Sequence, residues 1–196
     1  MDIKIILGAI AVVIGMLGYL FYIRGILKGE VKPHAFTWSV WGILTSIAFI
    51  AQVVEGGGPG AWVTGATAVM SFVFATVGLG ASSRVYIKKD DWIIFIFTLL
   101  AIPVWFVTEN SLWAVVLITI IDAVAFAPTF RKAYNHPTTE STWTYFLSGT
   151  KFLVGILALE SFNTITVLYP ASLVVANGAF VAMVIYRRHK SSNIVE

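Results

Sequence analysis

Seven apolar stretches follow one another along the chain, each separated from the next by a short polar gap. A helix needs roughly 17–25 apolar residues to cross the hydrocarbon core of a bilayer, and each stretch is about that long. Because lipid offers no partners to backbone N–H and C=O groups, unbroken runs of this length favour helices. We therefore predict an all-α membrane protein with seven transmembrane helices, at residues 3–23, 36–54, 61–82, 92–108, 112–130, 142–159 and 165–186.

Basic side chains occur in alternate gaps between these stretches. The second, fourth and sixth gaps hold no Lys or Arg and carry Glu55, Glu109 and Glu160 instead. Cytoplasmic loops of membrane proteins hold the excess of Lys and Arg, so we expect the N-terminus outside and the C-terminus in the cytoplasm, with the chain in the plasma (inner) membrane. The basic residues that set this orientation are Arg24, Lys28 and Lys32; Arg84, Lys88 and Lys89; Arg131 and Lys132; and Arg187, Arg188 and Lys190.

Composition narrows the classes of function. The chain is 58% hydrophobic and 12% charged, and it has no cysteine, which excludes disulfides and cysteine-ligated metals. The net charge of +3 lies in the gaps and the tail, so it indicates topology rather than nucleic-acid binding. No constellation of residues is typical of a catalytic or metal site. We predict no enzyme activity, no cofactor and no metal.

A weak internal repeat relates the two ends of the chain. Thr37 and Trp38 match Thr142 and Trp143, and both copies run helix, basic loop, proline, helix, acidic loop, helix. The middle stretch is left over, and one spare crossing gives both copies the same orientation. We predict a first three-helix repeat at 1–90, a linker transmembrane helix at 91–110, and a second three-helix repeat with a short cytoplasmic tail at 111–196.

The order of three helices, a linker and three helices resembles the SWEET sugar transporters and the wider PQ-loop superfamily. The local match is best in Pro128-Thr-Phe-Arg-Lys132 and in Thr139-Glu-Ser-Thr-Trp143, which are similar to the proline-plus-basic loop and Ser/Thr-rich helix start of a second PQ-loop repeat. The resemblance implies an alternating-access carrier or, as in the KDEL receptor, a sorting receptor. It also implies hinges at Pro128, Pro33 and Pro137, and a binding residue in the last helix that matches Asn177, with Ser71 near the partner position.

Two charges fall at the middle of the predicted membrane. Asp122 lies ~15 Å inside stretch 112–130 and Lys151 ~14 Å inside stretch 142–159, at 1.5 Å per residue. Each charge costs roughly 2.5–3.5 kcal/mol at this depth, so opposite charges on consecutive helices should pair. We predict an Asp122–Lys151 charge pair that marks a solute pathway. A structural clamp between two helices, or a proton-coupled version in which Asp122 takes up a proton and releases Lys151, would explain the same residues.

Small and polar residues share helix faces in several stretches, although such faces also serve helix packing. Most tryptophans lie near helix ends, as in an aromatic belt, but Trp41 is about a turn deeper. We predict a membrane carrier for a small polar solute: a sugar, a nucleoside-like compound or an amino acid. The alternative is a non-transporting PQ-loop-like receptor or scaffold, and self-association is left open. The predicted substrate-binding residues are Asp122, Lys151, Asn177, Ser71, Ser46 and Trp41.

Overall fold

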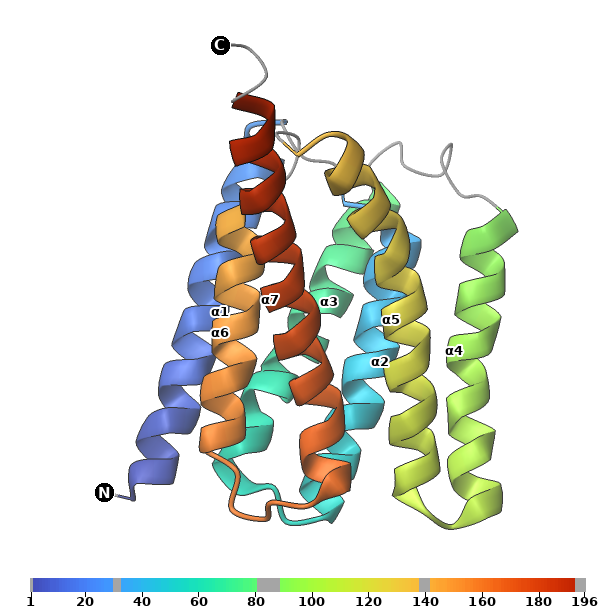
Figure 1. Cartoon of the computed structure of the whole chain (residues 1–196). Helices are drawn as coiled ribbons and strands as arrows, with labels where there is room; N and C mark the ends of the chain where they lie inside the picture. Colours follow the sequence, from blue (N-terminus) through green and yellow to red (C-terminus); the bar gives the residue numbers. More distant parts are fainter. Residues whose placement is uncertain (1, 30–32, 81–88, 138–141, 193–196) are drawn as a thin grey trace.

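The computed structural model describes residues 2–29, 33–80, 89–137 and 142–192 (Figure 1). Within these ranges the chain is mostly helical and forms no strand. Lys32, Arg84 and Lys88, which the orientation argument uses, lie outside them. The elements are α1 (Ile3–Leu27), α2 (Ala35–Val54), the 3₁₀ turn η1 (Gly58–Ala61), α3 (Trp62–Gly80), α4 (Lys89–Thr108), α5 (Ser111–Asn135), α6 (Thr142–Leu157) and α7 (Thr164–Ser192).

Five segments are long and apolar enough to cross a membrane, as expected of an integral membrane protein. They comprise α1, α2, η1 together with α3, α5, and α7. The helix α6 has 16 residues, and the apolar part of α4 found among the described residues is Phe95–Val104. Seven crossings therefore stay a prediction, whereas the all-helical class is confirmed.

Successive helices run in opposite directions along the bundle (Figure 1). The chain's N-terminus lies at the same end as η1 and the α4–α5 and α6–α7 connections. We call this the N-terminal end of the bundle. The chain's C-terminus lies at the other end, where α1, α3 and α5 finish, and we call this the C-terminal end.

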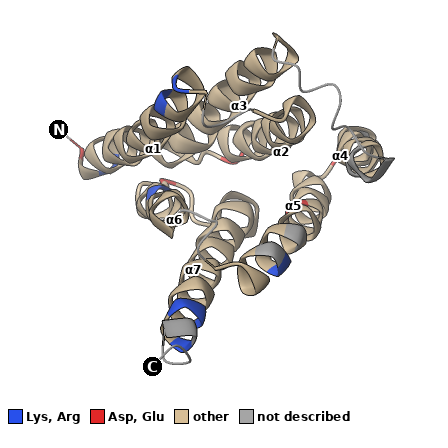
Figure 2. Cartoon of the chain, turned by 90° about the horizontal axis from the view of Figure 1, so that it is seen from above, with Lys and Arg blue, Asp and Glu red and all other residues tan. Residues whose placement is uncertain are grey.

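The helices form two groups when the bundle is seen along its length (Figure 2). We call α1, α2 and α3 the first trio and α5, α6 and α7 the second trio. In the first trio α3 packs against both α1 and α2, and in the second α7 packs against both α5 and α6. Between the trios, α1 packs against α6 and α2 against α5, while α4 lies outside, against α2 and α5.

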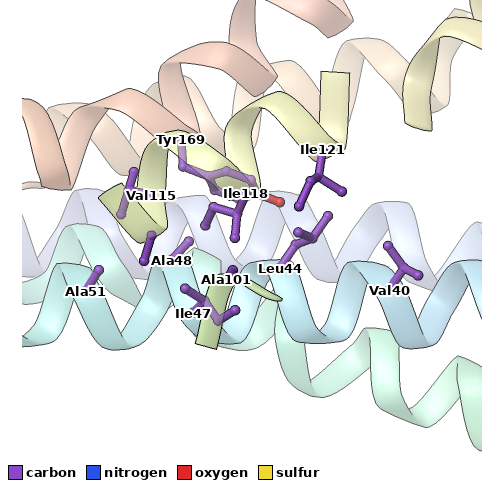
Figure 3. Close-up of a cluster of buried hydrophobic side chains, with 11 residues drawn as sticks. Val40, Leu44, Ile47, Ala48, Ala51, Ala101, Val115, Ile118, Ile121 and Tyr169 are labelled. Atoms are coloured by element: carbon purple, nitrogen blue, oxygen red, sulfur yellow. The ribbon is translucent and has the colours of Figure 1, made fainter. Parts of the chain in front are cut away.

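The largest buried apolar cluster lies where α2, α4, α5 and α7 meet (Figure 3). Leu44 and Ala48 of α2 face Ile118 of α5, with Tyr169 of α7 beside them. A much smaller cluster lies at the α1–α6 side, with Ala11, Val63 and Phe152 as its buried members. The trios thus share a large buried apolar cluster where α2 meets α5 and a small one where α1 meets α6, although α1 and α6 pack against each other more extensively.

The backbones of the two trios pack closely at the N-terminal end of the bundle. A Cβ added at Gly60 would lie 2.6 Å from the backbone nitrogen of Leu159 and 2.7 Å from the carbonyl oxygen of Gly155. Only glycine fits such an approach, because any side chain would overlap backbone atoms of the second trio. The backbone N–H groups of Glu160 and Ser161 also donate to the carbonyls of Gly57 and Gly56, each at 3.2 Å.

Lys4 ties the two trios together at the same end. Its Nζ donates to the carbonyl oxygens of Leu157, at 2.9 Å, and Leu159, at 2.8 Å. The last carbonyls of a helix have no partner within the helix and carry partial negative charge, so a lysine there satisfies them. Lys4 thus caps the end of α6 from the start of α1.

Candidate functional site

A cavity of about 440 Å³ lies between the two trios. Its walls come from α1, α2, α3, α5, α6 and α7, so every helix of both trios contributes. The lining spans residues 14–22 of α1, 38–45 of α2 and 144–152 of α6. Along these three helices the cavity therefore extends from the middle of the bundle towards its C-terminal end, away from the tightly packed turns around Gly60.

Asp122 lies on this cavity, near the middle of α5. Only 8% of its surface is exposed, and the side chain of Trp41 on α2 is its hydrogen-bond partner. An indole N–H can only donate, so it serves the carboxylate as one donor. Asp122 and Trp41 thus join the second trio to the first inside the cavity wall.

Lys151 also belongs to the lining, in α6, with 5% of its surface exposed. Its Nζ donates to the hydroxyl of Tyr19 at 2.9 Å and to Oγ1 of Thr67 at 3.0 Å. The Thr67 hydroxyl in turn donates to the carbonyl of Val63 at 2.7 Å, which orients its oxygen to accept from the lysine. The Tyr19 ring lies 4.7 Å from Nζ and adds a cation–π contact.

The predicted Asp122–Lys151 charge pair is wrong as a direct contact. Both residues belong to the described part of the chain and both line the cavity, but no salt bridge joins them. The prediction assumed that consecutive helices pack side by side. In the second trio α7 contacts both α5 and α6 and holds them apart, so the two charges face the cavity from separate walls. A proton moving onto Asp122 would accordingly have no lysine bond to release.

Of the four other predicted binding residues, three line the cavity and one does not. Trp41, Ser71 and Asn177 line the cavity together with the two charges. The Asn177 amide donates to the carbonyl of Leu173 at 2.7 Å, whereas Ser71 Oγ is buried without a hydrogen-bond partner. Ser46 is not among the lining residues, and its hydroxyl donates to the carbonyl of Gly42 at 2.7 Å.

The prolines expected to act as hinges lie at helix ends or within a helix. Pro33 is buried just before α2, and the buried Pro137 accepts a hydrogen bond from Nε of Arg188 at 2.9 Å. Pro128 falls within α5, but its side chain lies outside the described residues. The hinge role of all three stays a prediction.

Aromatic side chains form the part of the site that sequence analysis missed. Trp38, one of the tryptophans near a helix end that the sequence suggested for an aromatic belt, lines the cavity and donates from Nε1 to the hydroxyl of Tyr22 at 2.9 Å. The spacing of Gly15, Tyr19 and Tyr22 on one face of α1 was the available signal. The aromatic residues of the lining are Tyr19, Tyr22, Trp38, Trp41, Phe126, Tyr145, Phe152 and Tyr169.

Among the described residues, no group of three or more His, Asp or Glu side chains is placed to hold a metal ion. Comparison of the chain with protein-family models, with curated proteins and with solved structures gives no match. The SWEET and PQ-loop resemblance is consequently an expectation from sequence alone, and the function has to be argued from the cavity.

Proposed function

We propose that this protein is a membrane carrier that moves a small polar solute by alternating access between the two trios. The observation that carries the proposal is the cavity itself. It lies between the trios, holds a buried acid and a buried base near mid-helix, and gives way to closely packed backbone at the N-terminal end. Charges inside a membrane bundle are costly and usually mark a solute or ion pathway.

The contacts between helices support two repeats of the same fold. We exchange α1 with α5, α2 with α6 and α3 with α7. The contact between α1 and α6 then corresponds to the contact between α5 and α2, and both contacts occur. The contact of α2 with α7 likewise becomes that of α6 with α3, and both occur. Such a pairing is expected for two parallel repeats related by an axis along the membrane normal, with α4 as the linker.

The charge pattern supports an orientation for the carrier. Arg24, Lys28, Arg131 and Arg187 lie near helix ends at the C-terminal end of the bundle, and the excess of basic residues marks the cytoplasmic side. The cavity would then face the cytoplasm, and the packed N-terminal end would face outside. Seven crossings follow if α4 and α6 span the bilayer alongside the five longer segments.

Labelling of single cysteines tests this topology, because the natural chain has none. Cysteine at Glu109 or Phe162 should react with an impermeant maleimide added outside intact cells. Cysteine at Lys28, Asn135 or Lys190 should react only after the cells are opened. Reaction of Asn135→Cys and Phe162→Cys from the same side would show that α6 does not cross.

Uptake into proteoliposomes tests transport. The purified full chain should accumulate at least one of three labelled probes, a sugar, a nucleoside or an amino acid, above empty liposomes. Lys151→Met should abolish that uptake, because the variant removes the positive charge from the cavity. Lys190→Met, at an exposed site on α7, should leave uptake unchanged. Absence of uptake for all three classes by folded protein would contradict the carrier and favour a receptor or scaffold.

A further inference from the structure

The two cavity charges each keep hydrogen-bonding capacity that the described protein groups do not use. An ammonium has three N–H donors, and Lys151 gives two of them to Tyr19 and Thr67. A carboxylate has about four acceptor positions, and Asp122 has one named donor, Trp41. One cavity wall therefore offers a free cationic donor and another offers free anionic acceptors.

Alternating access requires the cavity to close around its solute. Closing removes water from Asp122 and Lys151, and a buried charge without a counter-charge is strongly unfavourable. A solute with a single charge would neutralise one wall and leave the other uncompensated. A solute that carries both an ammonium and a carboxylate supplies both counter-charges at once.

The rest of the lining selects the body of the solute. The rings of Tyr22 and Trp38 have centroids 5.1 Å apart, as do those of Trp38 and Trp41. Phe126 and Tyr145 form a second ring pair on α5 and α6, at 5.8 Å. Aromatic faces at these separations favour further rings stacked beside them and also attract cations.

Ser71 supplies an independent sign that the cavity is built for a polar ligand. Ser71 is one of the lining residues, and its hydroxyl is buried without a hydrogen-bond partner. A buried hydroxyl without a partner is destabilising, so most buried hydroxyls have one. A ligand group within the cavity would provide the missing bond.

From these observations we infer that the cavity recognises a zwitterion with an aromatic or apolar body, its carboxylate at Lys151 and its ammonium at Asp122 beside the rings of Trp41 and Trp38. The inference rests on the proposed carrier function and names its substrate class. An aromatic α-amino acid has this chemistry. Sugars and nucleosides, which sequence analysis left open, do not.

Three probes with the same phenyl body test each charge separately. They are L-phenylalanine, 2-phenylethylamine, which lacks the carboxylate, and 3-phenylpropanoate, which lacks the ammonium. Binding of each to the wild-type full chain in nanodiscs is measured by calorimetry, with glucose as the uncharged probe. Phenylalanine should bind at least about tenfold more tightly than either analogue, because each analogue forfeits one charge-assisted contact. Glucose should not bind.

Two variants assign the charges to their walls. Asp122→Asn should lose most of its affinity for phenylalanine and should bind 3-phenylpropanoate more tightly than 2-phenylethylamine. Lys151→Met should show the opposite preference between the two analogues. Glu109→Gln and Lys190→Met, matched changes at exposed positions, should keep the wild-type order. If a cavity variant does not fold, the wild-type probe series alone decides.

The outcomes separate this inference from the proposed function. Equal binding of phenylalanine and either analogue would overturn the zwitterion, and so would glucose binding without phenylalanine binding. Glucose uptake in proteoliposomes would keep the carrier and discard the zwitterion. Tight, charge-selective binding of phenylalanine with no uptake of any solute would keep the zwitterion site and discard the carrier.

Discussion

The two ends of the bundle use opposite kinds of residue where the trios meet. At the N-terminal end, glycines let backbone approach backbone, as Gly60 does against Gly155 and Leu159. From the middle towards the C-terminal end, the trios meet through tyrosine, tryptophan and phenylalanine side chains that surround a cavity. Large rings keep helices apart, whereas glycine lets them touch. The sequence thus encodes where the halves close and where they leave space through side-chain size.

The largest expected effect comes from breaking the packed end. Gly60→Ala places a Cβ against backbone atoms that cannot move independently, so we expect a loss of about 2 kcal/mol or more in unfolding free energy. Chemical denaturation followed by circular dichroism measures it. Gly178→Ala, where an added Cβ meets nothing within 4 Å, is the matched control and should gain up to about 1 kcal/mol from helix propensity. Equal effects in the two variants would refute the packing argument.

A smaller effect should follow from removing the Lys4 cap. Lys4→Met deletes two charge-assisted hydrogen bonds between the trios at a half-exposed site, and we expect a cost of about 1 kcal/mol. A cysteine at position 64, in Thr64→Cys, serves as a buried reporter near the start of α3. Adding Lys4→Met should speed the labelling of this cysteine from the N-terminal side. Lys190→Met serves as control. An unchanged labelling rate would mean that the packed glycines, and not the lysine, keep this end shut.

The smallest effect is expected on the cavity side. Ser71→Ala removes a buried hydroxyl that has no partner, so the protein without solute should gain about 0.5–1 kcal/mol in unfolding free energy. The variant should at the same time bind its solute more weakly. Ser46→Ala loses a satisfied hydroxyl and should not gain stability. A loss of stability in Ser71→Ala, measured by denaturation without solute, would argue against a ligand-binding role for that hydroxyl.

The hydrophobic pattern predicted the helices well, because a long apolar run in lipid can satisfy its backbone groups only as a helix. The helix predicted at residues 36–54 is Ala35–Val54 in the structure, and the helix predicted at residues 142–159 is Thr142–Leu157. The helices α5 and α7 extend past their apolar stretches, to Asn135 and Ser192. Backbone hydrogen bonding does not require apolar side chains, so a helix can continue into water where its hydropathy ends.

The position of each charge along its helix was predictable, but its neighbours were not. A fixed rise per residue places Asp122 and Lys151 near mid-helix whatever the packing. Which helices lie side by side depends on tertiary contacts, and the partners of Lys151 come from α1 and α3, far away in sequence. The direct pair failed for this reason, and the aromatic lining around Tyr19 and Trp38 went unnoticed.

The uneven division of the apolar core has a mechanical consequence. The large cluster around Leu44, Ile118 and Tyr169 lies along the edge where α4 packs against α2 and α5. The opposite edge, between α1 and α6, has only the small cluster around Ala11 and Phe152. The α2–α5 edge is therefore held mainly by buried apolar side chains, with α4 packed against both helices. The α1–α6 edge, which carries both Lys4 and Lys151, is held by extensive helix packing and by polar bonds, so the two edges would respond differently to a force that separates the trios.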